Sequence, residues 1–265
     1  MIDWDDAFDN SGYVPEASEI GAAWVAAAEA FRTKQPYAVL DHPYGSGDRE
    51  RFDLFLPEGL PKGVVVFVHG GYWHMRAKSD WSHFSKGFLN HGWAVAIVGY
   101  TLAPTVRISQ ITQSIAAAVA EVAKTVEGPL RLVGHSAGGH LVSRMMCQGV
   151  LSDGLIARVQ RVVSVSGVHD LRPLVGTRMN DTLGLTKAEA LAESSALLEP
   201  ADVPVTFWVG ADERPEFLRQ NRLIAEGWGL KGADVSTVYQ PAENHFTVIN
   251  GLVDENSKLV CEVLR

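Results

Sequence analysis

The strongest constraint on the fold of this chain is a set of short, continuously apolar runs bounded by glycine, proline or charged residues. Four of them read VVVFVH, AVAIVG, VVSVS and VTFWVG. A strand that is apolar on both faces is typical of the centre of a parallel sheet that helices cover on both sides. We therefore predict a layered α/β architecture with the sheet in the middle.

Eight strands are predicted from these runs and from weaker ones, and from the third strand onward they alternate with helices. The segment PYGSGDRE between the first two strands contains a glycine turn, which favours an antiparallel hairpin at one edge. The predicted strands are Tyr37–Asp41, Arg51–Leu56, Val64–His69, Ala94–Gly99, Leu130–Gly134, Val162–Ser166, Val205–Gly210 and Val235–Tyr239. The predicted helices are Ile20–Arg32, Asp80–Asn90, Ser109–Thr125, Ser136–Gly149, Pro215–Glu226 and Asp254–Leu264.

Two segments stand outside this alternation. Leu171–Asp202 joins two strands with too many residues for one tight turn, so we expect a short helical excursion over the sheet that is a candidate lid. Residues 1–35 are expected to form an N-terminal helical segment. The whole of 1–265 is predicted to be one domain, since a chain of 265 residues can bury a substantial core.

The charge of the chain limits its partners. A formal net charge of −8 argues against binding to nucleic acid or to anionic membranes, which both require a basic surface. The opening MIDWDDAFDN is acidic, and no apolar run approaches the roughly 20 residues that span a bilayer. We therefore predict a cytoplasmic protein with a small-molecule substrate. Its oligomeric state is left open, with a homodimer as one alternative.

The pentapeptide GHSAG places Ser136 in a G-x-S-x-G motif. The apolar run LRLVG precedes it and the amphipathic run SAGGHLVSRMMC follows it. This is the strand, turn and helix context in which a strained turn exposes a nucleophilic serine. A glycine-rich turn without a catalytic role is the alternative, and the pentapeptide alone would not exclude it. The context favours a nucleophile.

A serine nucleophile needs a base and an orienting carboxylate, in the chain order serine, acid, histidine. His245 follows the last predicted strand in the loop QPAENHF, where this arrangement places its base. Asp212 follows the strand VTFWVG directly and is the predicted acid, with Glu213 and Asp170 as alternatives. His69 and His135 flank the site too, but we expect them to hold loops by local hydrogen bonds. The remaining chemistry therefore concerns the oxyanion and the pocket.

The oxyanion of a tetrahedral intermediate needs preorganised donors, and the segment HGGYW offers glycine amides after the third strand. Gly71 and Ala137 are the predicted donors, while Gly70 shapes the turn or takes the place of Gly71. Aromatic side chains able to stack on an aryl ring of the substrate are Tyr72, Trp73, Tyr100 and Phe246, with ordinary packing as the alternative.

No motif for a metal or a cofactor is present in the sequence. The histidine pairs of HGGYWH and GHSAGGH do not match H-E-x-x-H, and the glycine-rich loops lack the lysine of a phosphate-binding loop. We therefore expect neither a metal ion nor a cofactor.

Taken together, five segments resemble the kynurenine formamidase (arylformamidase) group of the α/β-hydrolases: HGGYWHMRAKSDWSHF, GYTLAPTVRISQI, LVGHSAGGHL, SVSGVHDLRPL and GADERPEF. The resemblance implies an α/β-hydrolase fold, with a mostly parallel eight-stranded sheet, helices on both faces and a short helical lid insertion. It implies hydrolysis of N-formylkynurenine to kynurenine and formate. The site residues that it implies are Ser136, Asp212 and His245 as the triad, with Gly70, Gly71 and Ala137 around the oxyanion.

The resemblance is incomplete near the expected pocket. His74 stands where the group leads us to expect Gln, and Thr101 stands where we expect Asp, so these departures concern the choice of substrate rather than the chemistry. Formamide and ester cleavage share the same acyl-transfer machinery. We therefore predict an arylformamidase, with a carboxylesterase for small acyl esters as the alternative. A non-catalytic binding protein of the same fold is the alternative of another class, against which the complete set of serine, acid and base argues.

Overall fold

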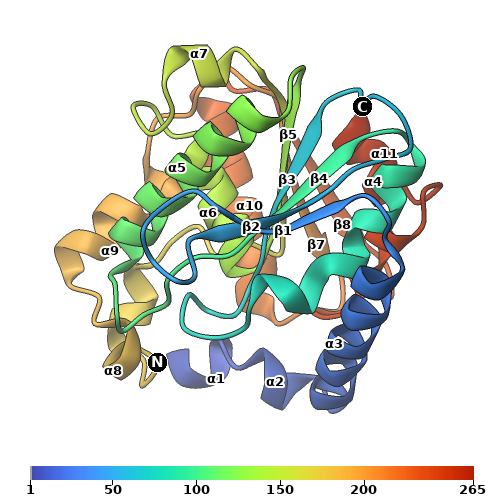
Figure 1. Ribbon diagram of the computed structural model, residues 1–265. Coiled ribbons are helices and arrows are strands. Elements are labelled where there is room, and N and C mark those ends of the chain that lie inside the picture. The colour runs from blue at the N-terminus through green and yellow to red at the C-terminus, as the bar shows by residue number, and fades with distance from the viewer. Residues whose placement is uncertain (1) are drawn as a thin grey trace.

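The computed structural model describes residues 2–265 and shows one eight-stranded sheet with the order β1-β2-β4-β3-β5-β6-β7-β8 (Figure 1). β1 and β2 form the predicted antiparallel hairpin, β2 is also antiparallel to β4, and the other pairings are parallel. All eight strands lie where the apolar runs predict them. Their bounds are β1 Ala38–Pro43, β2 Arg51–Phe55, β3 Val64–Val68, β4 Ala94–Val98, β5 Leu130–His135, β6 Val159–Val165, β7 Val205–Gly210 and β8 Val235–Gln240.

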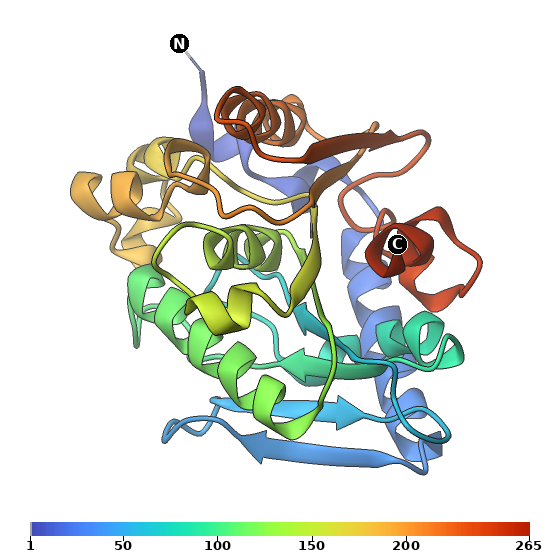
Figure 2. The same ribbon diagram turned by 90° about the horizontal axis from the view of Figure 1, so that it is seen from above.

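Helices cover both faces of the sheet, and Figure 2 shows α5 and α6 on one side and α3, α4 and α11 on the other. The α-helices are α1 Trp4–Ala7, α2 Asn10–Tyr13, α3 Ala17–Lys34, α4 Lys86–Asn90, α5 Ile108–Thr125, α6 Ala137–Met145, α7 Asp153–Ile156, α8 Asn180–Leu183, α9 Lys187–Glu193, α10 Pro215–Leu230 and α11 Lys258–Leu264. The 3-10 helices are η1 Lys78–Ser85, η2 Arg172–Gly176, η3 Ser195–Leu197 and η4 Asn250–Val253. None of the helices described here is long and apolar enough to cross a membrane.

The two faces of the sheet bury two separate cores. Along β3, Val64, Val66 and Val68 pack into one core, while Val65 and Phe67 pack into the other, and all five side chains are fully buried. Side chains of successive strand residues point to opposite faces, so a strand between two helical layers must be apolar at every position. This is the physical reason for the continuous apolar runs of the sequence.

The predicted helices are confirmed with shifted ends, and one of them changes type. The predicted helix Asp80–Asn90 begins as the 3-10 helix η1 and continues as α4. Segment 171–202 contains η2, α8, α9 and η3, as expected of a helical excursion. The short helices α1 and α2 precede α3, and Asp3 and Asp9 cap them through their side chains. We call residues 3–16, which contain α1 and α2, the N-terminal strap.

Candidate active site

The candidate nucleophile Ser136 lies in the turn between β5 and α6. Its backbone has φ 56° and ψ −118°, a conformation that residues other than glycine rarely adopt. The chain can turn this sharply because Gly138 lies against β3: a Cβ atom there would come within 1.9 Å of the carbonyl oxygen of Val68. The strained turn that the G-x-S-x-G motif predicts is therefore present.

The carboxylate that contacts His245 belongs to Glu213, not to Asp212. His245 Nδ1 lies 2.7 Å from Glu213 Oε2, and both side chains are buried. Asp212 is exposed, and its backbone amide donates to the carbonyl of Glu243, which holds this residue at the surface. The prediction of Asp212 as the acid is wrong because the turn after β7 directs the next side chain, one position further on, toward the histidine.

Two further contacts hold the Glu213 side chain in place. Its Oε1 atom accepts hydrogen bonds from the Ser166 hydroxyl and, at 2.9 Å, from the amide of Gly210. A buried carboxylate with all of these donors has a single orientation, and it can keep the imidazole in the tautomer that carries a proton on Nδ1. The other alternative, Asp170, pairs instead with Arg172 at 2.8 Å. The geometry therefore selects Glu213 among the three candidates.

The predicted oxyanion donors lie beside the serine with their amides unused. Among the described residues, the amides of Gly71 and Ala137 donate to no backbone acceptor, and Ala137 begins α6. Gly70 lies so close to the serine that a Cβ atom would come within 3.0 Å of the Cβ of Ser136. The loop continues through Tyr72 and Trp73, at φ 45° and 59°. Such a strained, fixed loop suits a set of preorganised donors.

The two flanking histidines hold loops, as the sequence suggests. His69 contacts the carbonyl of Gly70 through Nδ1 at 2.7 Å, and burial lowers its pKa to about 4. His135 contacts the carbonyl of His245 through Nε2 at 2.8 Å. Burial, together with the neighbouring His245, lowers the pKa of His135 well below its usual value. Both rings are therefore neutral at physiological pH, and their hydrogen bonds hold the neighbouring loops in place.

A cavity of about 80 Å³ brings the candidate residues together, and we call it the inner cavity. Ser136, His245, Gly71, Tyr72 and Phe246 all line it. Tyr72 and Phe246 therefore line the candidate site, and their role in binding a substrate stays a prediction. Within the described chain, no hydrogen bond joins the Ser136 hydroxyl to His245, and such contacts often tighten only when substrate binds.

Trp73 and Tyr100 do not line the inner cavity, and their prediction as substrate-binding residues is wrong. Both side chains are fully buried. Trp73 Nε1 donates to His140 Nδ1 at 3.2 Å, and the Tyr100 hydroxyl donates to the carbonyl of His69 at 3.0 Å. Their polar atoms are thus used to fasten the loop that carries Gly71. They support the site from behind rather than facing a substrate.

The walls of the inner cavity include residues that no motif indicates. Trp24 of α3 and Trp81 of η1 form an aromatic wall, with ring centroids 4.9 Å apart. Asn10 and Ser11 of the N-terminal strap complete the lining. The strap is fastened beside the acid, because Arg214 next to Glu213 pairs with Asp6 at 2.9 Å. The helices of the strap fall within the N-terminal helical segment 1–35 that the sequence predicts, but its contact with the site was not predicted.

A larger cavity of about 660 Å³ adjoins the inner one, and we call it the outer cavity. The two share Asn10, Ser11, Tyr72 and Met75 as lining residues. Segment 171–202 reaches the outer cavity through Arg178 and Met179. Whether this segment moves as a lid stays a prediction.

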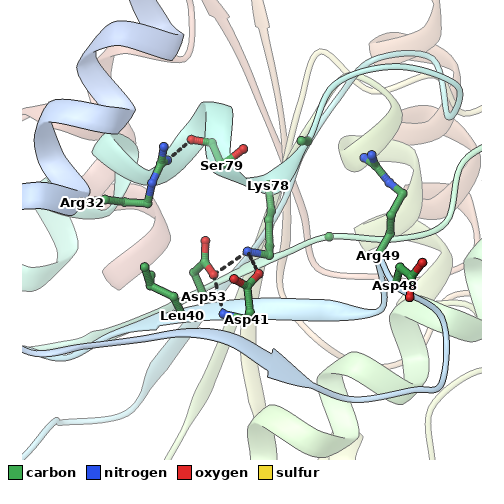
Figure 3. Close-up of a pocket in the computed structure, with 10 residues that line it drawn as sticks. Arg32, Leu40, Asp41, Asp48, Arg49, Asp53, Lys78 and Ser79 are labelled. Carbon is green, nitrogen blue, oxygen red and sulfur yellow. Dashed lines mark hydrogen bonds and ion pairs between the residues drawn. The ribbon is translucent and has the colours of Figure 1, made fainter.

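Another hollow, of about 290 Å³, lies away from the serine between α3, β1, β2 and η1 (Figure 3). In it Lys78 contacts both Asp41 and the buried Asp53, and Arg32 is bonded to the backbone of Ser79. The charges in this hollow therefore neutralise one another, and the contacts join the hairpin to η1.

The chain is similar to several known proteins. Residues 52–217 match the BD-FAE family model. The kynurenine formamidase of Danio rerio is 29% identical over 239 residues, which cover 86% of this chain and 81% of that protein. The kynurenine formamidase of Drosophila melanogaster is 28% identical over 242 residues, which cover 85% and 80% of the two chains.

Solved structures show the same fold. A crystal structure of a proposed thioesterase from Silicibacter sp. TM1040 is 46% identical, covers 100% of both chains and superposes with a TM-score of 0.96. Esterase B from Lactobacillus rhamnosis, at 18% identity and a TM-score of 0.67, covers 95% of this chain and 92% of its own. With more than half of its length matched by the family model, this chain is a hydrolase of the α/β-hydrolase fold and belongs to the BD-FAE family.

Proposed function

We propose that the protein is a serine hydrolase that cleaves aryl formamides such as N-formylkynurenine by acyl transfer. In this proposal Ser136 is the nucleophile, His245 the general base and Glu213 the carboxylate that orients it. The observation that carries the proposal is the 2.7 Å contact of His245 with Glu213 at the wall of the cavity that holds Ser136. A buried acid, a base and a strained serine at one cavity are the geometry of acyl-transfer catalysis.

The reaction follows from the positions of these groups. Ser136 Oγ attacks the formyl carbon while His245 Nε2 takes its proton, and Glu213 stabilises the resulting imidazolium through Nδ1–H. The amides of Gly71 and Ala137 donate to the oxyanion of the tetrahedral intermediate. His245 then protonates the leaving nitrogen, which departs as an aryl amine. Water activated by the same histidine attacks the formyl-enzyme and releases formate.

The size of the inner cavity favours a small acyl group. A cavity of about 80 Å³ beside the serine suits a formyl or acetyl group, whereas a long acyl chain would not fit without rearrangement. The larger part of the substrate, its leaving group, would then extend toward the outer cavity of about 660 Å³. The kynurenine formamidases among the relatives support this choice of substrate.

A carboxylesterase for small acyl esters is the second candidate. The esterase and thioesterase among the structural relatives favour it, and the machinery for the two reactions is the same. Steady-state kinetics with N-formylkynurenine, p-nitrophenyl acetate, p-nitrophenyl octanoate and phenyl thioacetate would separate the candidates. We expect the octanoate to be the poorest ester. If kcat/KM for N-formylkynurenine were orders of magnitude below that for p-nitrophenyl acetate, the formamidase proposal would be dropped.

The nucleophile is tested by Ser136→Ala, with the exposed Ser46→Ala as the control. We expect Ser136→Ala to reduce kcat by at least about 10⁴-fold for formamide and ester alike, since removal of the nucleophile disables the whole triad. Its melting temperature should stay close to that of the natural protein. Turnover above one tenth of the natural rate would exclude Ser136 as the nucleophile.

A further inference from the structure

Arg76 places a permanent positive charge at the wall of the inner cavity. Apart from the ionisable His245, the described residues that share this wall are otherwise aromatic, apolar or neutral polar groups. An arginine keeps its charge at all physiological pH values, and its planar guanidinium can bind a carboxylate through two parallel hydrogen bonds. A guanidinium among neutral groups is stabilised when an anion binds to it.

No such partner is present in residues 2–265. None of the ion pairs in this part of the chain includes Arg76, and its guanidinium donates no hydrogen bond to another described residue. Nearby arginines behave differently: Arg49 donates to the carbonyl of Tyr100 at 3.0 Å, and Arg214 pairs with Asp6. Arg76 is thus distinguished from its neighbours by having an unused guanidinium at the cavity.

The backbone and the neighbouring helix hold this side chain at the cavity. Arg76 has φ 74°, a left-handed conformation that is uncommon for arginine, and its carbonyl accepts a hydrogen bond from the guanidinium of Arg49. Gly21 of α3 lies directly against the guanidinium, since a Cβ atom there would come within 2.5 Å of Arg76 Nη2. A glycine inside a helix costs about 1 kcal/mol relative to alanine. This position therefore gives up helix stability and leaves room for the guanidinium.

We propose that Arg76 binds a carboxylate on the leaving group of the substrate, so that the enzyme prefers aryl formamides and esters whose leaving group carries a negative charge. This inference rests on the proposed function for the identity of the scissile bond. The inner cavity of about 80 Å³ suits a small acyl group, so the carboxylate belongs to the leaving group. Met75 lines both cavities and directly precedes Arg76, so Arg76 lies beside the boundary that the leaving group crosses. The outer cavity is lined by four aspartates and by Arg178, which pairs with Asp5, so its lining is acidic overall and disfavours a carboxylate. This leaves Arg76 as the cation that can bind the carboxylate of the leaving group.

The test compares two esters that differ only in charge. The anionic ester is 3-(2-acetoxyphenyl)propanoate, and its neutral counterpart is 3-(2-acetoxyphenyl)propanamide. Both are measured with the natural enzyme and with Arg76→Gln, after subtraction of the uncatalysed rate. We expect Arg76→Gln to lower kcat/KM for the anionic ester about 10- to 100-fold, the usual range for loss of a charge-assisted contact, and for the neutral ester less than threefold.

Two further variants make the result specific. Arg76→Lys keeps the charge but not the fork of donors, so it should recover part of the preference for the anionic ester. Arg222→Gln removes an exposed cation of α10, whose side chain is 62% exposed, and should leave the preference unchanged. An equal loss for both esters in Arg76→Gln, or no loss for either, would overturn the proposal.

The same data keep this inference separate from the formamidase proposal. If the natural enzyme fails to hydrolyse N-formylkynurenine but prefers the anionic ester, the formamide substrate is wrong and Arg76 retains its role. If it hydrolyses N-formylkynurenine and Arg76→Gln does so with unchanged kcat/KM, the role of Arg76 is refuted while the formamidase activity stands.

Discussion

Exchanging the carboxylate for an amide at two adjacent positions tests the assignment of the acid most sharply. The Glu213 carboxylate accepts hydrogen bonds from three donors: His245 Nδ1–H, the Ser166 hydroxyl and the Gly210 amide. Glu213→Gln replaces one of the accepting oxygens by an NH₂ group, which is itself a donor. A neutral amide cannot stabilise the imidazolium, and its donor group favours the wrong tautomer of His245. The adjacent variant, Asp212→Asn, changes an exposed side chain.

The expected loss follows from the number and burial of these contacts. The side chain of Glu213 is 0% exposed, so solvent does not screen its contact with the imidazolium. Loss of an orienting triad carboxylate costs about 10³- to 10⁴-fold in kcat, or roughly 4 to 5.5 kcal/mol of transition-state stabilisation. Asp212→Asn should change kcat less than about twofold, as expected of an exposed residue.

The assay is the kcat for p-nitrophenyl acetate at pH 7.5, together with the melting temperature of each variant. Glu213→Gln should fold, because the amide fills the same volume, so that a loss of kcat reports chemistry rather than unfolding. The reasoning fails if Asp212→Asn loses more activity than Glu213→Gln, or if Glu213→Gln retains more than one tenth of the natural kcat.

Two further predictions concern stability. Burial lowers the pKa of His69 and of His140 from 6.5 to about 4. Between these two pH values the unfolded chain binds more protons than the folded chain. The stability that these neutral rings permit above pH 6.5 is therefore lost as the pH falls toward 4. Each ring should cost about 1 kcal/mol between pH 7.5 and 5.5, measured as the free energy of urea unfolding, and a pH-independent value would contradict this. Gly138→Ala should destabilise the protein by several kcal/mol or prevent folding, since its Cβ would meet the Val68 carbonyl oxygen at 1.9 Å. Gly154→Ala, which meets nothing within 4 Å, should stay within about 1 kcal/mol of the natural protein, and equal losses for the two would refute the steric argument.

The fold could be predicted from the sequence because its signals are local. A strand buried on both faces must be apolar at every position, and VVVFV and AVAIV show this directly. Ser136 and His245 could also be placed, since a motif marks the first and the position after the last strand marks the second. Short helices carry weaker signals: α1 and α2 have four residues each, and the prediction of a helical segment at 1–35 does not resolve them as separate helices.

The acid could not be selected because Asp212 and Glu213 are adjacent and chemically similar. Which of them faces the histidine depends on the backbone turn after β7, where the Glu213 amide donates to the carbonyl of Gly210. The prediction of Trp73 and Tyr100 as substrate-binding residues was wrong for a related reason. Trp73 and Tyr100 flank glycine-rich loops in the sequence, but their hydrogen bonds to His140 and to the His69 carbonyl turn them inward. Long-range contacts of this kind leave no local pattern.

The fastening of the N-terminal strap has a practical consequence for how the enzyme is produced and compared. Arg214 follows the acid directly in the chain and binds both Asp6 and the carbonyl of Asp9. A fusion to the first residues is therefore attached close to the strap, which contacts Arg214, the neighbour of the Glu213 that contacts the His245 imidazole. The C-terminal residue follows α11, at the opposite end of the molecule from the strap (Figure 1). We therefore expect a purification tag at the C-terminus to disturb the candidate site less than a tag at the N-terminus.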